Sequence, residues 1–533
     1  MSTRKAVTKA AGIMTAAILL SRLLGLVRES VISGVFGQSR VTDIYVAAFK
    51  LPDVLFYLIA GGALSSAFIP VFTEYLKAGR EREAWKTFSV VATTMGIVVM
   101  AFVIVGEVFA RRLVPYVSAP GFDSTQLDKV AFLTRIILPS QFFFFIGGLM
   151  MGTLYSRGQF VAPGLGPSVY NVGIIFGGLL LGERLGVAGL CWGALTGAFL
   201  GNFLLQMVVL RRVGVSYRPS LDLHDPGAGK VWRLMLPVIF GLSLPQIDVW
   251  INGLFATFLR GGLMTALVRG NQLMQVPVGV FGQSTALGFF PTLSAHAAQR
   301  ETQDFKRTLN YGMRLILFAA IPSSVLLAVL AKPITALIFQ HGRFTASDTR
   351  SVAITLVFYS IGVSGWCLQA IVARAFYALQ DTFTPVWTGT LMTVVFVPIK
   401  YAVVRYGGNP LFWGMALGTS LSATTHVALL LIIARRRLRG IHGRLLLSSA
   451  CKVSVASAAF GVVSWLVVSL MSRLHAVTTI GVKGQALGEI LASLILGGAA
   501  FLAIVRLLKV EEAAEAWGMV KERFRGGKGS GGS

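Results

Sequence analysis

Long apolar runs separated by short polar connections extend along almost the whole chain. Runs of roughly 20 residues, enough to span a bilayer as a helix, number about fourteen, the last two near 449–471 and 487–508. The longest polar connections, around 211–233 and 435–444, contain only about 10 to 25 residues. The pattern predicts an all-α polytopic membrane protein with about 14 transmembrane helices and no large soluble domain.

Composition agrees with this prediction, because 55% hydrophobic and 13% charged residues make a 533-residue chain too apolar to be soluble. A formal net charge of +26 would suggest a nucleic-acid partner in a soluble protein. Where the charges lie along the chain decides whether that interpretation applies here. With connections assigned alternately to two sides, Lys and Arg divide roughly 27 to 11. The positive-inside rule then predicts that both termini are cytoplasmic, and no nucleic-acid partner is expected.

Several residues recur at one spacing. The pairs are Tyr155 with Tyr377, Pro163 with Pro385 and Phe122 with Phe344, each 222 residues apart, and Pro70 with Pro291, 221 apart. Six spans with their loops occupy about 220 residues, so the offset predicts two six-helix lobes in parallel orientation. We expect an N-terminal lobe at 1–225, a second lobe at 226–440, two appended helices at 441–510 and a cytoplasmic tail at 511–533 ending in the linker-like GGKGSGGS. Chance recurrence in an apolar sequence is the alternative.

In carriers built from two halves, broken helices often line the path between the lobes. Proline and glycine mark candidate breaks in the first two helices of each lobe. The positions are Gly25; Pro52 with Gly61 and Gly62; Pro237 and Pro245; and Pro277 with Gly279 and Gly282. Close helix packing through small residues is the competing explanation for the glycines.

Two arginines, Arg22 and Arg28, interrupt the first apolar run. An arginine inside the membrane costs at least ~2.5 kcal/mol, so it usually faces a bundle interior or a wet cavity. Arg22 lies ~18 Å past the membrane entry, near mid-bilayer, whereas Arg28 is close enough to the outer boundary to extend toward the headgroups. Six residues separate them by about 120° around a straight helix, so only a bend, for example at Gly25, aims both at one cavity.

Four more polar residues are candidates. Asp43 opens the second span and either contacts substrate or caps the helix N-terminus. Asp248 is an intramembrane acid, suited to ion coupling or to a buried hydrogen-bonded structural role. Arg269 and Gln272 are one turn apart in the eighth span, within reach of one anion, although Arg269 is also close enough to the outer boundary to extend into the headgroups.

Sequence motifs for ATP-driven or hydrolytic enzymes are absent: there is no G-x-x-x-x-G-K-[ST], H-E-x-x-H or G-x-S-x-G. We therefore expect no enzyme activity, metal or cofactor. A driving force would come from a monovalent cation gradient or from the membrane potential.

Seven stretches in order along the first twelve predicted helices resemble one known family. They are SRLLGLVRESVISGVFGQSRVTDIYVAAFKLPD, AFIPVFTEY, VSAPGF, PGLGPSVYN, QLMQVPVGVFG, FQHGRFT and ARAFYALQDTFTP. On these motifs the chain is similar to the MurJ/MviN-type lipid II flippases of bacterial cell-wall synthesis. That family belongs to the superfamily of multidrug, oligosaccharidyl-lipid and polysaccharide exporters.

The resemblance implies fourteen helices around a central cavity in the bacterial cytoplasmic (inner) membrane. It implies flipping of lipid II, undecaprenyl-pyrophosphate-linked disaccharide-pentapeptide, from the inner to the outer leaflet by alternating access. Membrane lipids and other cell-wall synthesis proteins are further candidate partners. By matching motif positions, Arg22, Arg28 and Asp43 correspond to functionally important family residues.

Two positions depart from the family pattern. Where many relatives have two arginines and a glutamate in the second helix, this chain has Phe56, Tyr57 and Gly61. Gln272 replaces an arginine of the eighth helix, and Arg269 is the candidate substitute. An ion-coupled multidrug extruder of the same superfamily and a non-transporting cell-wall scaffold remain alternatives. A cation exporter should line its cavity with acids and aromatics, so the arginines argue against the first.

Overall fold

The computed structural model describes residues 3–57, 63–475 and 481–513, and in these residues the regular secondary structure is entirely helical. Nine described helices are long and apolar enough to cross a membrane. The helices α16 (Ala346–Ser360) and α17 (Val363–Ala378), bent by 44° at their junction, form a tenth if they count as one span. The predicted all-α polytopic fold is therefore confirmed.

The nine spans take up thirteen labelled elements. They are α5 (Glu81–Val117); α6 (Ser124–Ile137) with α7 (Ser140–Ser156); α8 (Val161–Leu185); α9 (Val187–Ala198) with η2 (Phe199–Leu204) and α10 (Leu205–Val213); α14 (Thr302–Val329); α18 (Phe383–Ala402) with η4 (Val403–Gly407); α19 (Trp413–Arg437); α20 (Gly443–His475); and α21 (Val482–Leu507).

Four further helical stretches carry the charged residues that the sequence places inside the membrane. They are α1 (Thr3–Phe36); α2 (Arg40–Ala48), α3 (Lys50–Leu55) and α4 (Ala63–Lys77); α11 (Pro226–Ala256); and α12 (Leu263–Pro277), η3 (Val278–Gln283) and α13 (Ser284–Ala298). The predicted total of about fourteen counts these stretches as spans. The remaining described elements are short: α15 (Ala331–Phe339) and the 3-10 turn η5 (Asn409–Leu411).

The chain forms two compact units. The first comprises Met1–Thr265 with His341–Thr345, and the second comprises Ala266–Gln340 with Ala346–Ser533. Helix α11 belongs to the first unit because it packs against α4 and α5. The division therefore falls after Thr265, whereas the predicted lobes divide at 225, and the lobes stay a prediction from the repeat. Residues 514–533 of the predicted tail lie outside the described residues.

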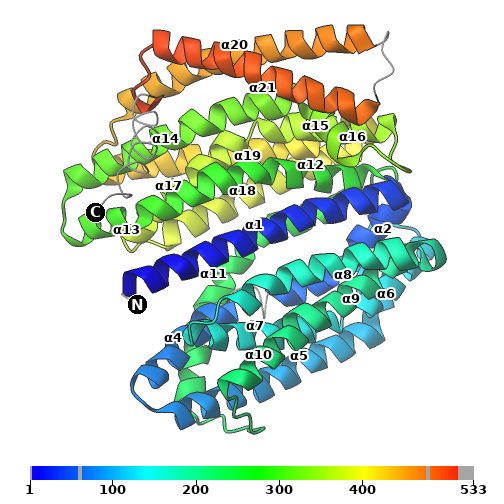
Figure 1. Ribbon diagram of the computed structural model, residues 1–533, viewed down its shortest axis with the longest axis vertical. Helices are drawn as coiled ribbons and strands as arrows, with labels where there is room; N and C mark the ends of the chain where they lie inside the picture. Colours follow the sequence, from blue (N-terminus) through cyan, green and yellow to red (C-terminus); the bar gives the residue numbers. More distant parts are fainter. Residues whose placement is uncertain (1–2, 58–62, 476–480, 514–533) are drawn as a thin grey trace, which may run out of the picture. The chain divides into compact units, whose positions relative to one another are not determined.

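In the first unit, α8 is packed between α1 and α9, and Figure 1 shows α8 and α9 running side by side. A Cβ placed on Gly177 of α8 would overlap the carbonyl oxygen of Gly189 in α9. A Cβ placed on Gly193 of α9 would come equally close to the carbonyl oxygen of Gly173 in α8. Small residues allow this approach, which is a common means of packing membrane helices. Another buried cluster of this unit forms where apolar side chains of α4, α5 and α7, several of them aromatic, pack together.

In the second unit, α14 packs against α17 and α20, and α20 and α21 lie side by side as the orange and red helices of Figure 1. Val453 and Ala456 of α20 are buried against Val505 of α21. Phe318 of α14 contacts Phe501 of α21 at 5.8 Å between ring centroids. The two appended helices therefore share one core with the helix they cover.

The residues of the repeat occupy equivalent places. Tyr155 and Tyr377 lie in the last turns of α7 and α17, and the prolines eight residues later lie in the first turns of α8 and α18. Phe122 and Phe344 are both buried in loops, after α5 and α15. Pro70 and Pro291 lie within α4 and α13. The paired residues therefore lie at corresponding places in their local structures, as the predicted repeat would require.

Helix irregularities appear at two of the predicted sites. A π-helical turn begins at Phe56, directly after Pro52 and the short helix α3, and the π-helix η3 begins at Val278, after Pro277, and includes two glycines. The predicted break at Gly25 is wrong, because α1 is one continuous α-helix from Thr3 to Phe36. Gly61 and Gly62, and the side chains of Pro237 and Pro245, lie outside the described part of the chain.

Candidate functional site

Arg28 is held against α8 by a hydrogen-bonded network. Its Nη1 donates to Oδ1 of Asn171 at 2.9 Å, and its Nη2 donates to Oε1 of Glu29 at 2.7 Å. Asn171 in turn donates from Nδ2 to the backbone oxygen of Ser21, at 3.2 Å. The Arg28 side chain is only 23% exposed. Its polar partners are therefore groups of the protein, and it does not extend into lipid headgroups.

Arg22 has a different environment although it lies on the same helix. Its side chain is exposed and forms no hydrogen bond or ion pair with any described residue. Its neighbours Leu19 and Leu23 are exposed apolar residues. Because α1 is unbroken, the six-residue spacing places Arg22 about 120° around the helix and ~9 Å along it from Arg28. The continuous helix turns Arg28 toward α8 and leaves Arg22 facing away from it.

Asp43 is a fully buried carboxylate that satisfies the backbone at the start of α12. Its oxygens accept hydrogen bonds from the backbone N–H groups of Gly262 at 2.7 Å and Thr265 at 2.9 Å, and from the Thr265 hydroxyl at 2.7 Å. Its own helix, α2, has Ser39 as its N-cap, and the N–H of Ser39 donates to Thr42 Oγ1 at 3.0 Å. Asp43 thus caps a helix N-terminus, but it is that of α12, which is distant in sequence, and not that of its own helix α2.

Asp248 lies in α11 and is partly buried. It accepts a hydrogen bond from Nδ2 of Asn252, one turn later, at 3.0 Å. The helix is also tied through Trp250, whose indole N–H donates to the Val117 carbonyl at 2.8 Å. An acid with an amide neighbour offers oxygen ligands of the type that a small cation or a proton would use, so the ion-coupling role stays a prediction.

Arg269 is the largest fully buried side chain among the described residues, with 0% exposure. Its guanidinium carbon lies 5.6 Å from the ring centroid of Phe339 in α15, a cation–π distance. Gln272, one turn later, is only partly buried. The burial contradicts the alternative in which Arg269 extends to the outer headgroups. It also means that Gln272, and not Arg269, is the more accessible of the two in this conformation.

Asn171 is the site residue that sequence reasoning missed. It lies in the motif PGLGPSVYN, quoted above only as part of the family resemblance. The available signal was an amide inside an apolar helix, where a polar side chain needs a partner. Its partner, Arg28, is 143 residues away in sequence, so the pairing required the fold.

The described residues thus form a polytopic helical membrane bundle with arginines inside helices α1 and α12. Solved structures share this fold: an inward-facing multidrug resistance MATE family transporter of the MOP superfamily matches 79% of this chain and 94% of its own, with TM-score 0.66 and 14% identity. A structure described as lipid II flippase MurJ, inward closed conformation, matches 93% of this chain and 98% of its own, with TM-score 0.76 and 23% identity. At these identities the structures show the fold.

Sequence comparisons give the family. The profile described as lipid II flippase MurJ matches residues 32–482. A probable lipid II flippase MurJ of Vibrio cholerae is 30% identical over 449 residues, covering 82% of this chain and 83% of the relative. One from Thermotoga maritima is 28% identical over 495 residues, covering 93% and 95%. The chain belongs to the MurJ family of lipid II flippases, which are multi-pass bacterial membrane transporters and not enzymes. Arg22 and Arg28 precede the matched segment.

Proposed function

We propose that this protein moves lipid II from the inner to the outer leaflet of the bacterial cytoplasmic membrane by alternating access, with both termini cytoplasmic. Family membership supports the substrate class. The observation that carries the site assignment is Arg22: an exposed guanidinium within an apolar helix, without a partner among the described residues. A charge held there at a cost of ~2.5 kcal/mol or more needs a compensating ligand.

The pyrophosphate of lipid II supplies such a ligand. A guanidinium donates two parallel hydrogen bonds to phosphate oxygens, and each bond to a charged acceptor contributes about 1.5–3 kcal/mol. Arg28 extends the positive surface of α1, while Glu29 and Asn171 fix its orientation. In this proposal Arg22 binds first because its guanidinium is free, and Arg28 becomes available to the same headgroup when α1 changes its packing against α8.

Asp248 is the proposed coupling residue. In the cycle a monovalent cation or a proton binds at its carboxylate beside Asn252, and the membrane potential favours inward movement of that charge by about 2.3 kcal/mol per 100 mV. Asp248→Asn should then leave headgroup binding intact and remove the dependence of flipping on an imposed potential. A variant that still responds to the potential like the wild type would contradict this role.

The test of the site compares Arg22→Ala with Arg184→Ala, which removes an exposed arginine at the far end of α8. Both variants should fold normally, because exposed substitutions usually change stability by less than about 0.5 kcal/mol. Only Arg22→Ala should lose lipid II export, about tenfold or more in a liposome flipping assay, and fail to complement a depleted host. Arg22→Lys should recover part of the rate, since an ammonium cannot reproduce the bidentate geometry.

Wild-type flipping by Arg22→Ala would overturn the assignment. The same assay separates the alternatives. If the protein is a cell-wall scaffold, even the wild-type protein should show no flipping. If it is a multidrug extruder, it should move cationic dyes in place of lipid II.

A further inference from the structure

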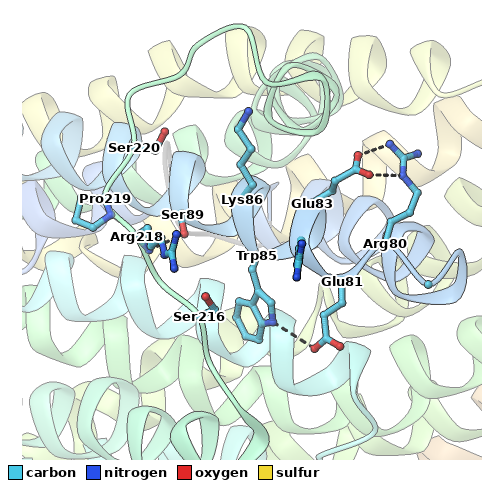
Figure 2. Close-up of a pocket in the computed structure, with 12 residues that line it drawn as sticks. Arg80, Glu81, Glu83, Trp85, Lys86, Ser89, Ser216, Arg218, Pro219 and Ser220 are labelled. Atoms are coloured by element: carbon cyan, nitrogen blue, oxygen red, sulfur yellow. Dashed lines mark hydrogen bonds and ion pairs between the residues drawn. The ribbon is translucent and has the colours of Figure 1, made fainter.

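A pocket of about 520 Å³ lies in the second unit, between α13 and α14. Residues of α13 between 284 and 292 form one wall, and Thr308 and Leu315 of α14 form the other. None of the described residues that line it carries a charge. The pocket of the first unit in Figure 2 differs in this respect, because basic side chains such as Arg80 and Lys86 line it. The uncharged pocket is poorly suited to a phosphate or a carboxylate.

Hydroxyl groups supply the polarity of this pocket. They belong to Ser284, Thr285, Thr292 and Thr308. The Ser284 hydroxyl donates to the backbone oxygen of Val280. The three threonine hydroxyls form no hydrogen bond with any residue in the described part of the chain. Three groups that can each donate and accept therefore line the pocket without a partner.

Threonines in other apolar helices of the chain behave differently. The hydroxyls of Thr153, Thr335 and Thr390 each donate to the carbonyl oxygen four residues earlier, at 3.0, 2.7 and 3.0 Å. A bond of this kind to the helix's own backbone satisfies a hydroxyl inside the membrane. The threonines of the pocket do not make it, so their hydroxyls are available to a ligand.

Phe289 gives the pocket an apolar wall in a fixed position. Its ring centroid lies 5.8 Å from that of Tyr311, and a Cβ placed on Gly312 would lie 3.2 Å from the Phe289 ring. Gly288, the preceding residue, leaves the adjoining space open, since a Cβ placed there would meet nothing within 4 Å. An apolar ring, a few convergent polar groups and open space are the usual features of a small-molecule site.

The pocket begins near the predicted cytoplasmic boundary. Lys306 and Arg307 directly precede Thr308 in α14 and belong to the connections that the charge distribution assigns to the cytoplasm. Leu315 is seven residues, or ~10 Å, further along the helix. The pocket thus extends from that boundary into the membrane, on the side where the proposed transport cycle loads its substrate.

We propose that this pocket binds an uncharged sugar ring of the lipid-linked headgroup, an inference that rests on the proposed transport of lipid II. A sugar ring has an apolar C–H face, which suits the Phe289 ring, and hydroxyls at its rim, which both donate and accept. The other parts of lipid II fit less well. The pyrophosphate and the terminal carboxylate of the peptide require cations, and the prenyl chain would leave the threonine hydroxyls without partners.

The test compares two lipids that differ only in their sugar: undecaprenyl pyrophosphate, and the same lipid carrying the disaccharide without its peptide. Native mass spectrometry measures the binding of each to the purified full chain, in a detergent whose headgroup contains no sugar. The wild type should bind the disaccharide lipid about tenfold more tightly or better. Thr292→Val with Thr308→Val should remove most of this difference, because each neutral hydrogen bond contributes about fivefold in affinity. Binding of undecaprenyl pyrophosphate should not change.

A second variant reaches the same site by filling it. Gly288→Leu occupies the open space beside Phe289 and should also remove the preference for the disaccharide lipid. Its matched control is Gly498→Leu in α21, where a Cβ meets open space outside the pocket. The control for the threonines is Thr390→Val with Thr393→Val, whose hydroxyls bond to their own helix. Each control should change either affinity by less than about twofold, because such substitutions usually change stability by less than about 0.5 kcal/mol.

The remaining outcomes decide against the proposal. Equal weakening of both lipids in the pocket variants would assign these residues to packing, and an unchanged preference for the disaccharide lipid would remove the site. Displacement of that lipid by the free disaccharide at the same concentration would identify a site for soluble sugars. A wild type that prefers the disaccharide lipid but does not flip lipid II in liposomes would contradict the transport function alone, so the two failures are distinguishable. If Gly288→Leu does not fold, the threonine variants decide.

Discussion

Replacing Asp43 distinguishes its two possible roles, as a ligand of the substrate and as a cap of a helix N-terminus. In Asp43→Ala, three donors lose a buried charged acceptor: the N–H groups of Gly262 and Thr265 and the Thr265 hydroxyl. Each hydrogen bond to a charged group contributes about 1.5–3 kcal/mol, part of which is recovered if water enters. We therefore expect a loss of about 3–5 kcal/mol in the free energy of unfolding. Asp43→Asn keeps one acceptor oxygen and should lose roughly half as much.

The measurement is thermal unfolding of the purified full chain in detergent, followed by intrinsic fluorescence and by size-exclusion chromatography after heating. For a unit of this size a loss of 1 kcal/mol lowers the Tm by about 2 °C, so Asp43→Ala should unfold about 6–10 °C below the wild type. The control is Asp128→Ala, which removes an exposed partner of Arg111 and should lower the Tm by less than about 2 °C.

Unfolding of Asp43→Ala at the wild-type temperature would contradict a stabilising role of these hydrogen bonds. Should that variant also lose lipid II flipping, the carboxylate serves the substrate, and its hydrogen bonds to α12 are incidental. A destabilised variant that still flips lipid II at low temperature would identify Asp43 as purely structural.

Three further predictions concern topology, the eighth span and helix packing. In a cysteine-free background, Arg343→Cys should react with an impermeant thiol reagent from outside intact cells, and labelling only after permeabilisation would reverse the predicted orientation. Arg269→Ala should lower the free energy of unfolding by about 2 kcal/mol or more and abolish export. Adding Gln272→Arg should restore export in a flipping assay without restoring the Tm. An Arg269→Ala variant with wild-type Tm and wild-type export would refute both expectations. Gly177→Ala should lower the Tm because its Cβ overlaps backbone in α9, while Gly25→Ala, where a Cβ meets open space, should not; equal Tm values would contradict the close α8–α9 contact.

The sequence was sufficient for the fold class because membrane spans are a local property. Each apolar run satisfies its own backbone hydrogen bonds, so composition and length predict it without knowledge of its neighbours. The repeat was equally accessible, since Tyr155 and Tyr377 mark the same helix end in the two halves. The break at Gly25 was predicted wrongly because a glycine in a membrane helix permits a bend but does not require one.

The partners of the charged residues were beyond reach from the sequence. The depth of Arg269 alone was compatible with headgroups or with a cavity, because its cation–π partner Phe339 is 70 residues away. Asp43 was rightly recognised as an acid suited to a helix N-terminus, yet the helix it serves begins more than 200 residues later. Both contacts depend on which helices pack together, and hydropathy carries no information on that choice.

Two of the four π-helical segments in the described residues lie at matching places in the two halves of the chain. They begin at Phe56 and Val278, 222 residues apart, which is the offset of the repeat. A π turn accommodates one extra residue within a helix, so the predicted duplication of a six-helix unit would account for the same irregularity at both places. Arg28 has no such counterpart, because the equivalent position in the second copy is Trp250. The helix irregularity therefore recurs at the repeat spacing, whereas the arginine occurs in the first half alone.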